Sequence, residues 1–216
     1  MTRILAWIAL AAASATAATA AEFKQFDTST YSQVVTECDR RASHPDDPNK
    51  VLPGLERAQM DLPAAIAACR ADLAKDPNNP RLLYHLARAL TYAGQTPEGL
   101  PLIERSASMK YPQSLFVTGY LYLEGEYGAP KDACRAAALV RESAEYGRLA
   151  GQVGFAAWSL AGRFKGCPVP QESAEMIVFL EAARARKLDY YAGLLVDVLL
   201  RELRSGSAAD STASPK

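Results

Sequence analysis

Prolines and glycines divide the chain after residue 60 into short segments of helical periodicity, and this pattern limits the possible folds more than any other feature. Within the first segment, Ile66, Cys69 and Leu73 recur at helical spacing. Proline removes a backbone donor and glycine ends helices in a left-handed conformation, so each break stops one helix. The pattern predicts helices over about 61–75, 81–93, 96–110, 113–124, 131–146, 151–164, 171–187 and 188–204, and no significant strand.

Three of these segments align as the first helices of a repeated helix–turn–helix unit. A shift of 32 residues places Pro80 on Pro112 and Ala87 on Gly119, and a further shift of 38 places Gly119 on Ala157. A small residue at this position allows the backbones of two paired helices to approach closely. Helical units of about 34 residues are typical of tetratricopeptide-type solenoids. The sequence therefore predicts an all-α solenoid of repeated helix pairs.

The second unit carries the most specific motif of the chain. Residues 115–132 read LFVTGYLYLEGEYGAPKD, and this segment resembles a Sel-one-like repeat, a relative of the tetratricopeptide. The positions that match the motif are Gly119, Tyr122, Gly125, Asp132, Ala136, Ala144 and Gly147. The third unit departs from it, because Gln171 and Glu172 stand where the aspartate belongs. The resemblance implies an interaction scaffold and leaves the partner undefined, since such repeats bind many different proteins.

The segment before the repeats also resembles a known module. It contains CDRRASHPDDP at 38–48, AIAAC at 65–69 and DPNNPR at 76–81. Together these resemble an N-terminal module of exported Sel-one-like proteins from alphaproteobacteria. The resemblance implies that the two cysteines of the module, Cys38 and Cys69, bond each other.

The chain has four cysteines, Cys38, Cys69, Cys134 and Cys167, and an even number after an export signal favours disulfides. Four cysteines allow three pairings. The sequential pairing, Cys38 with Cys69 and Cys134 with Cys167, is favoured because repeat proteins place contacts between neighbours in the chain. A metal site is the alternative, but no two cysteines have the short spacing of a zinc ligand pair.

The first 20 residues have the pattern of a signal peptide. Arg3 precedes an apolar run over 4–13, and the small residues at 18–20 fit a cleavage site. A membrane anchor is the alternative, but the run is shorter than the roughly 20 residues that a bilayer-spanning helix requires. We therefore expect a periplasmic or secreted bacterial protein, without a membrane span after cleavage.

The remaining chain is expected to form three regions. Residues 21–60 should comprise a loose leader, a short helix over 31–42 and a proline-rich loop. Residues 61–204 should form the repeat domain. Residues 205–216 are small and polar and are expected to be disordered.

Composition and motifs argue against several functions. The chain has 24 basic and 24 acidic side chains, a balance that offers no surface for nucleic-acid phosphates. No nucleophile–base–acid set, phosphate loop or metal motif is apparent, so we expect neither an enzyme nor a cofactor. Asp46 and Asp47, which lie between prolines, are expected to be solvated turn residues.

A partner-binding groove is the functional hypothesis that the repeat pattern supports. The first helix of each unit lines the concave face of such a solenoid, and tyrosine, tryptophan and arginine often anchor interfaces. The predicted groove residues are Arg81, Arg88, Tyr92, Tyr120 and Trp158. The two arginines, beside tyrosines, could bind a peptide carboxylate with paired hydrogen bonds. For Trp158, packing between units is the competing interpretation.

We therefore expect an exported, non-catalytic scaffold that binds a protein or a peptide in the cell envelope. The alternative is a structural subunit that docks permanently into a larger assembly through the helix at 188–204. That helix carries an apolar stripe of Leu188, Tyr191, Leu195, Val198 and Leu199. The competing interpretation of the stripe is that the helix caps the solenoid, since terminal repeats need a cap.

Overall fold

A computed structural model describes residues 23–212 of the chain, with side chains as far as residue 206. The regular structure in this part is helical throughout. Two short 3-10 helices are η1 (Thr28–Thr30) and η2 (Arg57–Gln59). The α-helices are α1 (Glu37–Ala42), α2 (Leu62–Lys75), α3 (Pro80–Tyr92), α4 (Thr96–Ser108), α5 (Pro112–Glu124), α6 (Ala133–Glu145), α7 (Leu149–Leu160), α8 (Ser173–Arg184) and α9 (Tyr190–Thr212).

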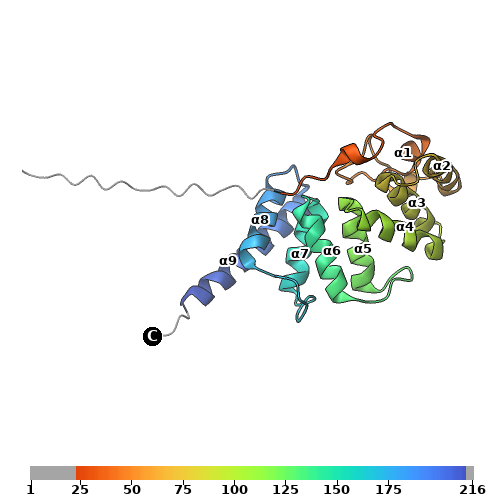
Figure 1. Cartoon of the computed structure of the whole chain (residues 1–216). Helices are drawn as coiled ribbons and strands as arrows, with labels where there is room; N and C mark the ends of the chain where they lie inside the picture. Colours follow the sequence, from red (N-terminus) through yellow and green to blue (C-terminus); the bar gives the residue numbers. More distant parts are fainter. Residues whose placement is uncertain (1–22, 213–216) are drawn as a thin grey trace, which may run out of the picture.

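The helices stack in the order of the sequence. Each of α2 to α9 packs against the helix before it, so the chain progresses from α1 and α2 at one end to α9 at the other (Figure 1). Contacts between neighbours in the chain are what a stack of repeated helix pairs requires. The prediction of an all-α architecture built from consecutive helix pairs is confirmed.

Local sequence signals set the helix boundaries. Pro80 and Pro112 occupy the first positions of α3 and α5, where the missing backbone donor costs nothing. Asp132 caps α6, because its side chain accepts hydrogen bonds from two backbone N–H groups of the first turn. Gly125 ends α5 with a φ of 71°, a left-handed conformation that glycine adopts without strain.

The small residue inside the repeat has the role that the alignment predicts. A Cβ atom on Gly119 of α5 would lie 2.6 Å from Cγ2 of Val140 on α6 and 3.3 Å from the carbonyl oxygen of Ala136. These distances leave no room for a larger side chain, since protein interiors are close-packed. Gly119 therefore sets the spacing between α5 and α6.

A second repeated feature links the helices of each pair. In one unit the hydroxyl of Ser106 on α4 donates to the carbonyl of Pro80 on α3. In the next unit the hydroxyl of Ser143 on α6 donates to the carbonyl of Pro112 on α5. Both serines are fully buried, so each bond satisfies a hydroxyl that would otherwise be costly to bury.

Two disulfides fasten the stack, with the sequential pairing that was predicted. Cys38 of α1 bonds Cys69 of α2, and Cys134 of α6 bonds Cys167 in the loop before α8. The two bonds close loops with sequence separations of 31 and 33 residues. Bonds across loops of this length stabilise a fold by about 3–4 kcal/mol each, mainly by restricting the unfolded chain.

The leader differs from its prediction. Residues 23–31, which we call the leader segment, lie across the stack instead of forming a loose end (Figure 1). The ring of Phe23 packs 6.2 Å from that of Phe179 on α8, and Phe26 packs 5.5 Å from Tyr111 before α5. Burial of these aromatic rings orders a segment that lacks helical periodicity.

The short helix after the leader is also shorter than predicted. It was expected over 31–42, but α1 begins at Glu37, because Thr36 forms a capping box with Asp39 and so starts the helix there.

The C-terminal boundary also requires correction. Residues 205–216 were predicted to be disordered, but α9 continues to Thr212. Once the packed part of a helix has formed, each further residue adds a hydrogen bond at little cost, so the helix extends past Leu203, which is buried in the core. Residues 213–216 and the predicted signal peptide, 1–20, lie outside the described residues.

The tight contact at Gly119 leads to a first prediction. Gly119→Ala should lower the free energy of unfolding by about 1–3 kcal/mol, because the new methyl group collides with Val140. Gly193→Ala is the matched control, since a Cβ atom on Gly193, inside α9, would meet nothing within 4 Å. The control should raise the free energy of unfolding by about 0.5–1 kcal/mol, the helix preference of alanine over glycine. Chemical denaturation monitored by circular dichroism would measure both, and equal effects would contradict the proposed spacing role.

Candidate functional site

A pocket of about 250 Å³ opens between α3, α5 and the loop that follows α1. Its lining is mainly apolar and aromatic, with a few charged groups. The lining residues are His44, Tyr84, Arg88, Thr91, Tyr92, Ile103, Val117, Tyr120, Leu121, Glu126 and Tyr127. Pockets that combine apolar walls with a few polar groups are the usual binding sites of proteins.

Tyrosines dominate the accessible part of this pocket. Tyr92 lies at the end of α3, Tyr120 lies on α5, and Tyr127 follows α5 in the turn between Gly125 and Gly128. Tyr127 is 41% exposed and adopts a left-handed conformation with a φ of 53°. Tyr92 and Tyr120 were predicted as groove residues, whereas Tyr127 was missed because the repeat pattern marks its turn only as a connection between helices.

An aromatic shelf continues the pocket towards α7. The rings of Phe116 and Trp158 stack nearly parallel, with ring centres 6.1 Å apart and an angle of 7° between their planes. Tyr120 joins the shelf to the pocket, since its ring lies 6.4 Å from that of Trp158. Trp158 was predicted as a groove residue. In the structure it is half-buried against Phe116 and lies beside the pocket, but it does not line the pocket.

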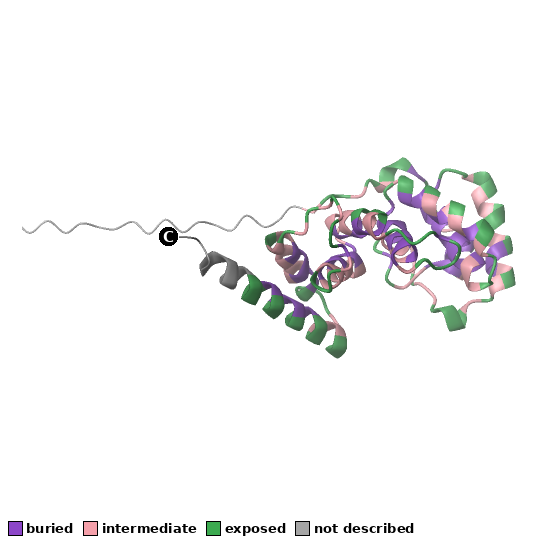
Figure 2. Ribbon diagram, turned by 90° about the horizontal axis from the view of Figure 1, so that it is seen from below, coloured by how far each residue is buried: buried purple, intermediate pink, exposed green. Residues whose placement is uncertain are grey.

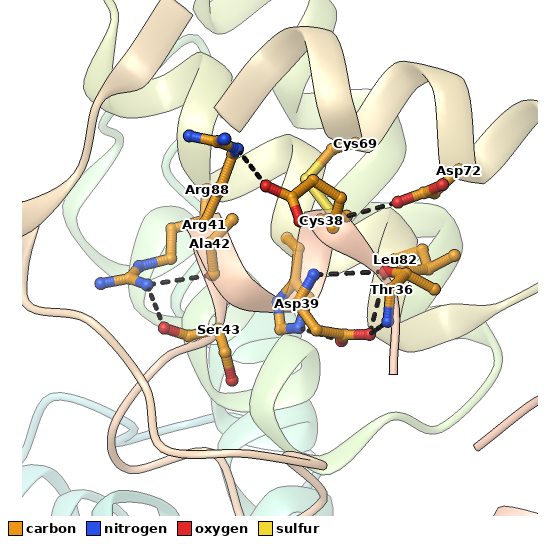
Figure 3. The surroundings of a disulfide bond; sticks show 12 residues. Thr36, Cys38, Asp39, Arg41, Ala42, Ser43, Cys69, Asp72, Leu82 and Arg88 are labelled. Carbon is orange, nitrogen blue, oxygen red and sulfur yellow. Dashed lines mark hydrogen bonds and ion pairs between the residues drawn. A yellow bond between two sulfur atoms is a disulfide. The ribbon is translucent and has the colours of Figure 1, made fainter. Parts of the chain in front are cut away.

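Arg88 lines the pocket but does not have the freedom that the peptide-carboxylate hypothesis needs. One guanidinium nitrogen donates to the carbonyls of Ala42 and Ser43 (Figure 3). Another donates to the carbonyl of Leu55. The guanidinium also lies 5.2 Å from the ring centre of Tyr92. Arg88 therefore holds the proline-rich loop against α3, and the prediction that it binds a peptide carboxylate is corrected.

Arg81 was also predicted in the groove, and the structure buries it completely. Its Nε lies 2.8 Å from Oδ1 of Asp39, and its Nη2 lies 3.2 Å from Oδ2, so the two side chains form a bidentate ion pair. The same guanidinium donates to the carbonyls of Ser32 and Val34. A partner cannot reach this arginine. The prediction was wrong because repeat periodicity places Arg81 on the inner face but does not show that the N-terminal module covers it.

The carboxyl group of Asp39 is the centre of this buried cluster. Burial alone would raise its pKa, but hydrogen bonding with His85 and with Arg81 outweighs burial and holds the pKa of Asp39 well below its usual range. Nε2 of His85 lies 3.2 Å from Oδ1 of Asp39. The same carboxylate also accepts from the backbone and the hydroxyl of Thr36, the cap of α1. Asp39 therefore joins α1 to α3.

The proline-rich loop covers the inner face at the start of α5. Asp47 was expected to be a solvated turn residue, but it is fully buried, and one of its oxygens accepts from the hydroxyl of Tyr111 at 2.7 Å. Burial raises the pKa of Asp47. Asp46 is exposed, in agreement with the expectation. The loop thus occupies part of the predicted groove and leaves the pocket as its open remainder.

A network of hydrogen-bonded side chains lies under the proline-rich loop. Arg148 donates through Nε to Oε1 of Gln113 at 2.5 Å, and Gln113 donates to the hydroxyl of Tyr84 at 2.9 Å. Arg148 is 5% exposed, so its charge is largely removed from water. Burial lowers the pKa of Arg148, although the guanidinium stays charged at any physiological pH. This network supports the floor of the pocket at Tyr84.

Comparisons with known proteins add no assignment. No protein-family model, curated protein or solved structure matches the chain. None of the helices in the described part combines the length and the hydropathy that a bilayer crossing requires. Within residues 23–212, no three His, Cys, Asp or Glu side chains are grouped so that they could hold a metal ion.

The buried ion pair leads to a second prediction. Asp39→Asn should lower the free energy of unfolding at pH 7 by about 3–5 kcal/mol, because Arg81 would remain buried without a charged partner. Asp47→Asn is the matched control, since Asp47 is equally buried but its raised pKa shows that the fold disfavours its charge. Asp47→Asn should lower the free energy of unfolding by at most about 1 kcal/mol. Urea denaturation would measure both, and a larger loss for Asp47→Asn would contradict this assignment.

His44, at the edge of the pocket, leads to a third prediction. Burial, followed by the positive charge of Arg88, lowers the pKa of His44 to about 4. As the pH falls below about 6.5, the unfolded chain gains a proton that the folded chain excludes, so the free energy of unfolding falls until about pH 4. Because the ring keeps some contact with water, we expect the free energy of unfolding to fall by only on the order of 1–2 kcal/mol over this pH range.

The measurement is the free energy of unfolding between pH 7 and pH 4 for the natural chain and for His44→Asn. Asparagine can still accept the hydrogen bond that the backbone of Asp46 donates to Nδ1 of His44. Above pH 4 the variant should lose less stability than the natural chain. Parallel pH profiles for the two proteins would show that His44 titrates normally.

Proposed function

We propose that this protein is an exported, non-catalytic repeat scaffold that binds a segment of another protein through the tyrosine-lined pocket. The observation that carries the proposal is the pocket itself, together with the aromatic shelf beside it. Tyrosine and tryptophan are the residues that most often anchor protein interfaces, because they contribute a large contact area at low entropic cost.

The volume of the pocket defines the kind of partner. A cavity of about 250 Å³ is smaller than most sites for drug-sized ligands and suits one or two side chains. Ile103, Val117 and Leu121 supply apolar walls, so the anchor should be an apolar or aromatic side chain. Both terminal nitrogens of Arg88 are engaged by backbone carbonyls, so a carboxylate held by their paired donors is not the group that we propose to be recognised.

The disulfides support the proposed compartment. Disulfides persist in oxidising environments such as the periplasm and the exterior of the cell, and both cysteine pairs of this chain are bonded. The sequence of residues 1–20 has the pattern of a signal peptide. We propose a periplasmic or secreted protein of Sel-one-like type. The close approach at Gly119 and the left-handed Gly125 support that type, because both glycines belong to the motif.

The fourth prediction tests the pocket. Tyr120→Ala and Tyr127→Ala should each reduce capture of the partner at least about tenfold, the loss that an interface anchor typically causes. The experiment crosslinks the tagged mature protein in an envelope extract and quantifies by mass spectrometry the proteins that the natural chain enriches. Val34→Ser is the matched control, because Val34 is 71% exposed and lies outside the pocket.

Thermal melting separates lost binding from lost folding. Both tyrosine variants should melt within a few degrees of the natural chain, because neither side chain is fully buried. If the enriched proteins persist with both variants, or if Val34→Ser removes them equally, the pocket is not the binding site.

A further inference from the structure

The polar groups of the tyrosine-lined pocket indicate the chemistry of its occupant. The side-chain hydroxyls of Tyr92, Tyr120 and Tyr127 take part in no hydrogen bond among the residues that the structure describes. The hydroxyl of Tyr84, at the floor, differs because it accepts from Gln113. Three hydroxyl groups in the open part of the pocket can therefore donate to acceptors that an occupant brings.

These hydroxyls favour an occupant that is rich in acceptors and poor in donors. Every peptide residue offers a carbonyl, but all except proline also bring a backbone N–H group that needs an acceptor of its own. Proline can therefore enter the pocket without leaving a donor unpaired. Its ring is apolar, as the walls of Ile103, Val117 and Leu121 require. Aromatic-lined grooves are common docking sites for proline-rich segments, which are extended before they bind and so lose little entropy.

The chain itself places its proline-rich loop on the same inner face. Residues 43–48 of the loop read SHPDDP. Arg88 of α3 donates to the carbonyl of the first of these residues, and Tyr111, at the start of α5, donates to Asp47. His44 of the same segment lines the pocket. The inner face thus already binds one proline-rich segment through its acceptor groups, and the pocket is the adjacent open part of that face.

The charges of the pocket favour a basic residue beside the proline. Arg88 and Glu126 bring the two full charges of the lining, because the lowered pKa of His44, about 4, leaves its ring neutral at pH 7. The terminal nitrogens of Arg88 are bound to carbonyls, whereas Glu126 is exposed and forms no ion pair within the described residues. The nearby Glu124 is already bound by both terminal nitrogens of Arg163. Glu126 is therefore the acidic group that a partner can engage.

We propose that the pocket binds a short proline-rich segment of the partner, with a proline between the tyrosines and a lysine or arginine paired with Glu126. This inference rests on the proposed binding function and names the chemistry of the partner. The basic side chain can also lie over the exposed ring of Tyr127, which follows Glu126 in the chain, because the face of an aromatic ring attracts a cation.

Fluorescence anisotropy with synthetic peptides tests the proline anchor. The probe is labelled Lys-Pro-Pro-Ala-Pro-Pro-Lys with blocked ends, which offers a basic residue in either direction of binding. The comparison peptide, Lys-Ala-Ala-Leu-Ala-Ala-Lys, has the same charge and an apolar anchor without proline. The mature protein should bind the proline probe at least about tenfold more tightly than the leucine peptide. Tyr120→Ala should raise the Kd of the proline probe at least about tenfold.

Charge exchange tests the role of Glu126. Glu126→Gln should raise the Kd of the lysine-ended proline probe about threefold, as expected for an exposed ion pair. The same variant should leave the Kd of Gln-Pro-Pro-Ala-Pro-Pro-Gln unchanged, because that peptide carries no charge. Glu126→Lys should prefer Glu-Pro-Pro-Ala-Pro-Pro-Glu, which reverses the preference of the natural chain.

Glu202→Gln is the matched control for charge. Glu202 is also an exposed carboxylate, but it lies on α9, whose outer side is exposed along the helix at the other end of the stack (Figure 2). This variant should bind every peptide as the natural chain does. Circular dichroism should show the same helix content for all the variants.

Three outcomes would overturn the inference. They are no saturable binding of the proline probe up to about 1 mM, equal affinity for the proline and leucine peptides, and a preference for lysine that Glu126→Gln leaves intact. If one of them occurs while Tyr120→Ala and Tyr127→Ala still lose the proteins captured from envelope extract, the proline inference alone fails. If the captured proteins persist with both variants, the proposed function fails, even where the proline probe binds.

Discussion

Two arginines of helix α3 hold the N-terminal module on the repeat stack. Arg81 pairs with Asp39 and donates to two carbonyls of the segment before α1, while Arg88 donates to carbonyls at both ends of the proline-rich loop. Removal of two guanidinium groups from water is expensive, and this geometry offsets the cost with charge-assisted hydrogen bonds. The position of the loop, the burial of Asp47 and the shape of the pocket all follow from these contacts.

The same contacts define what remains of the concave surface. A solenoid normally exposes its whole inner face to a partner. In this chain the loop covers the start of α5 and leaves the ends of α3 and α5 open. The proposed partner therefore meets a small aromatic pocket in place of a long groove, which favours recognition of one anchoring side chain over recognition of an extended peptide.

The sequence predicts much of the fold, because the signals for helix boundaries are local. Proline at the first helical position and the cap Asp132 mark the helices, and Gly119 marks the close approach of α5 and α6. The disulfide pairing follows from the order of the repeats. Tyr92 and Tyr120 were placed in the site on the same basis, since both belong to the inner face of a first helix.

Three errors at the site share one cause. Arg81, Arg88 and Asp47 were assigned to solvent or to a partner, because their residue types are usually exposed and no local pattern reveals that a distant segment covers them. Arg81 meets Asp39 across 42 residues, and Tyr111 meets Asp47 across 64. Such pairings depend on how the leader and the loop return to the stack, and single-sequence periodicity carries no information on that path.

The leader segment alters how a stack of this kind should unfold. Helical repeats contact only their neighbours, so a solenoid can open from its ends one unit at a time. Here Phe23 packs on Phe179 of α8, Lys24 binds Glu145 of α6, and Tyr31 packs against Arg81 of α3. The leader segment thus ties together units that are distant in the sequence. Opening either end disturbs the other, which converts a linear array into one cooperative unit.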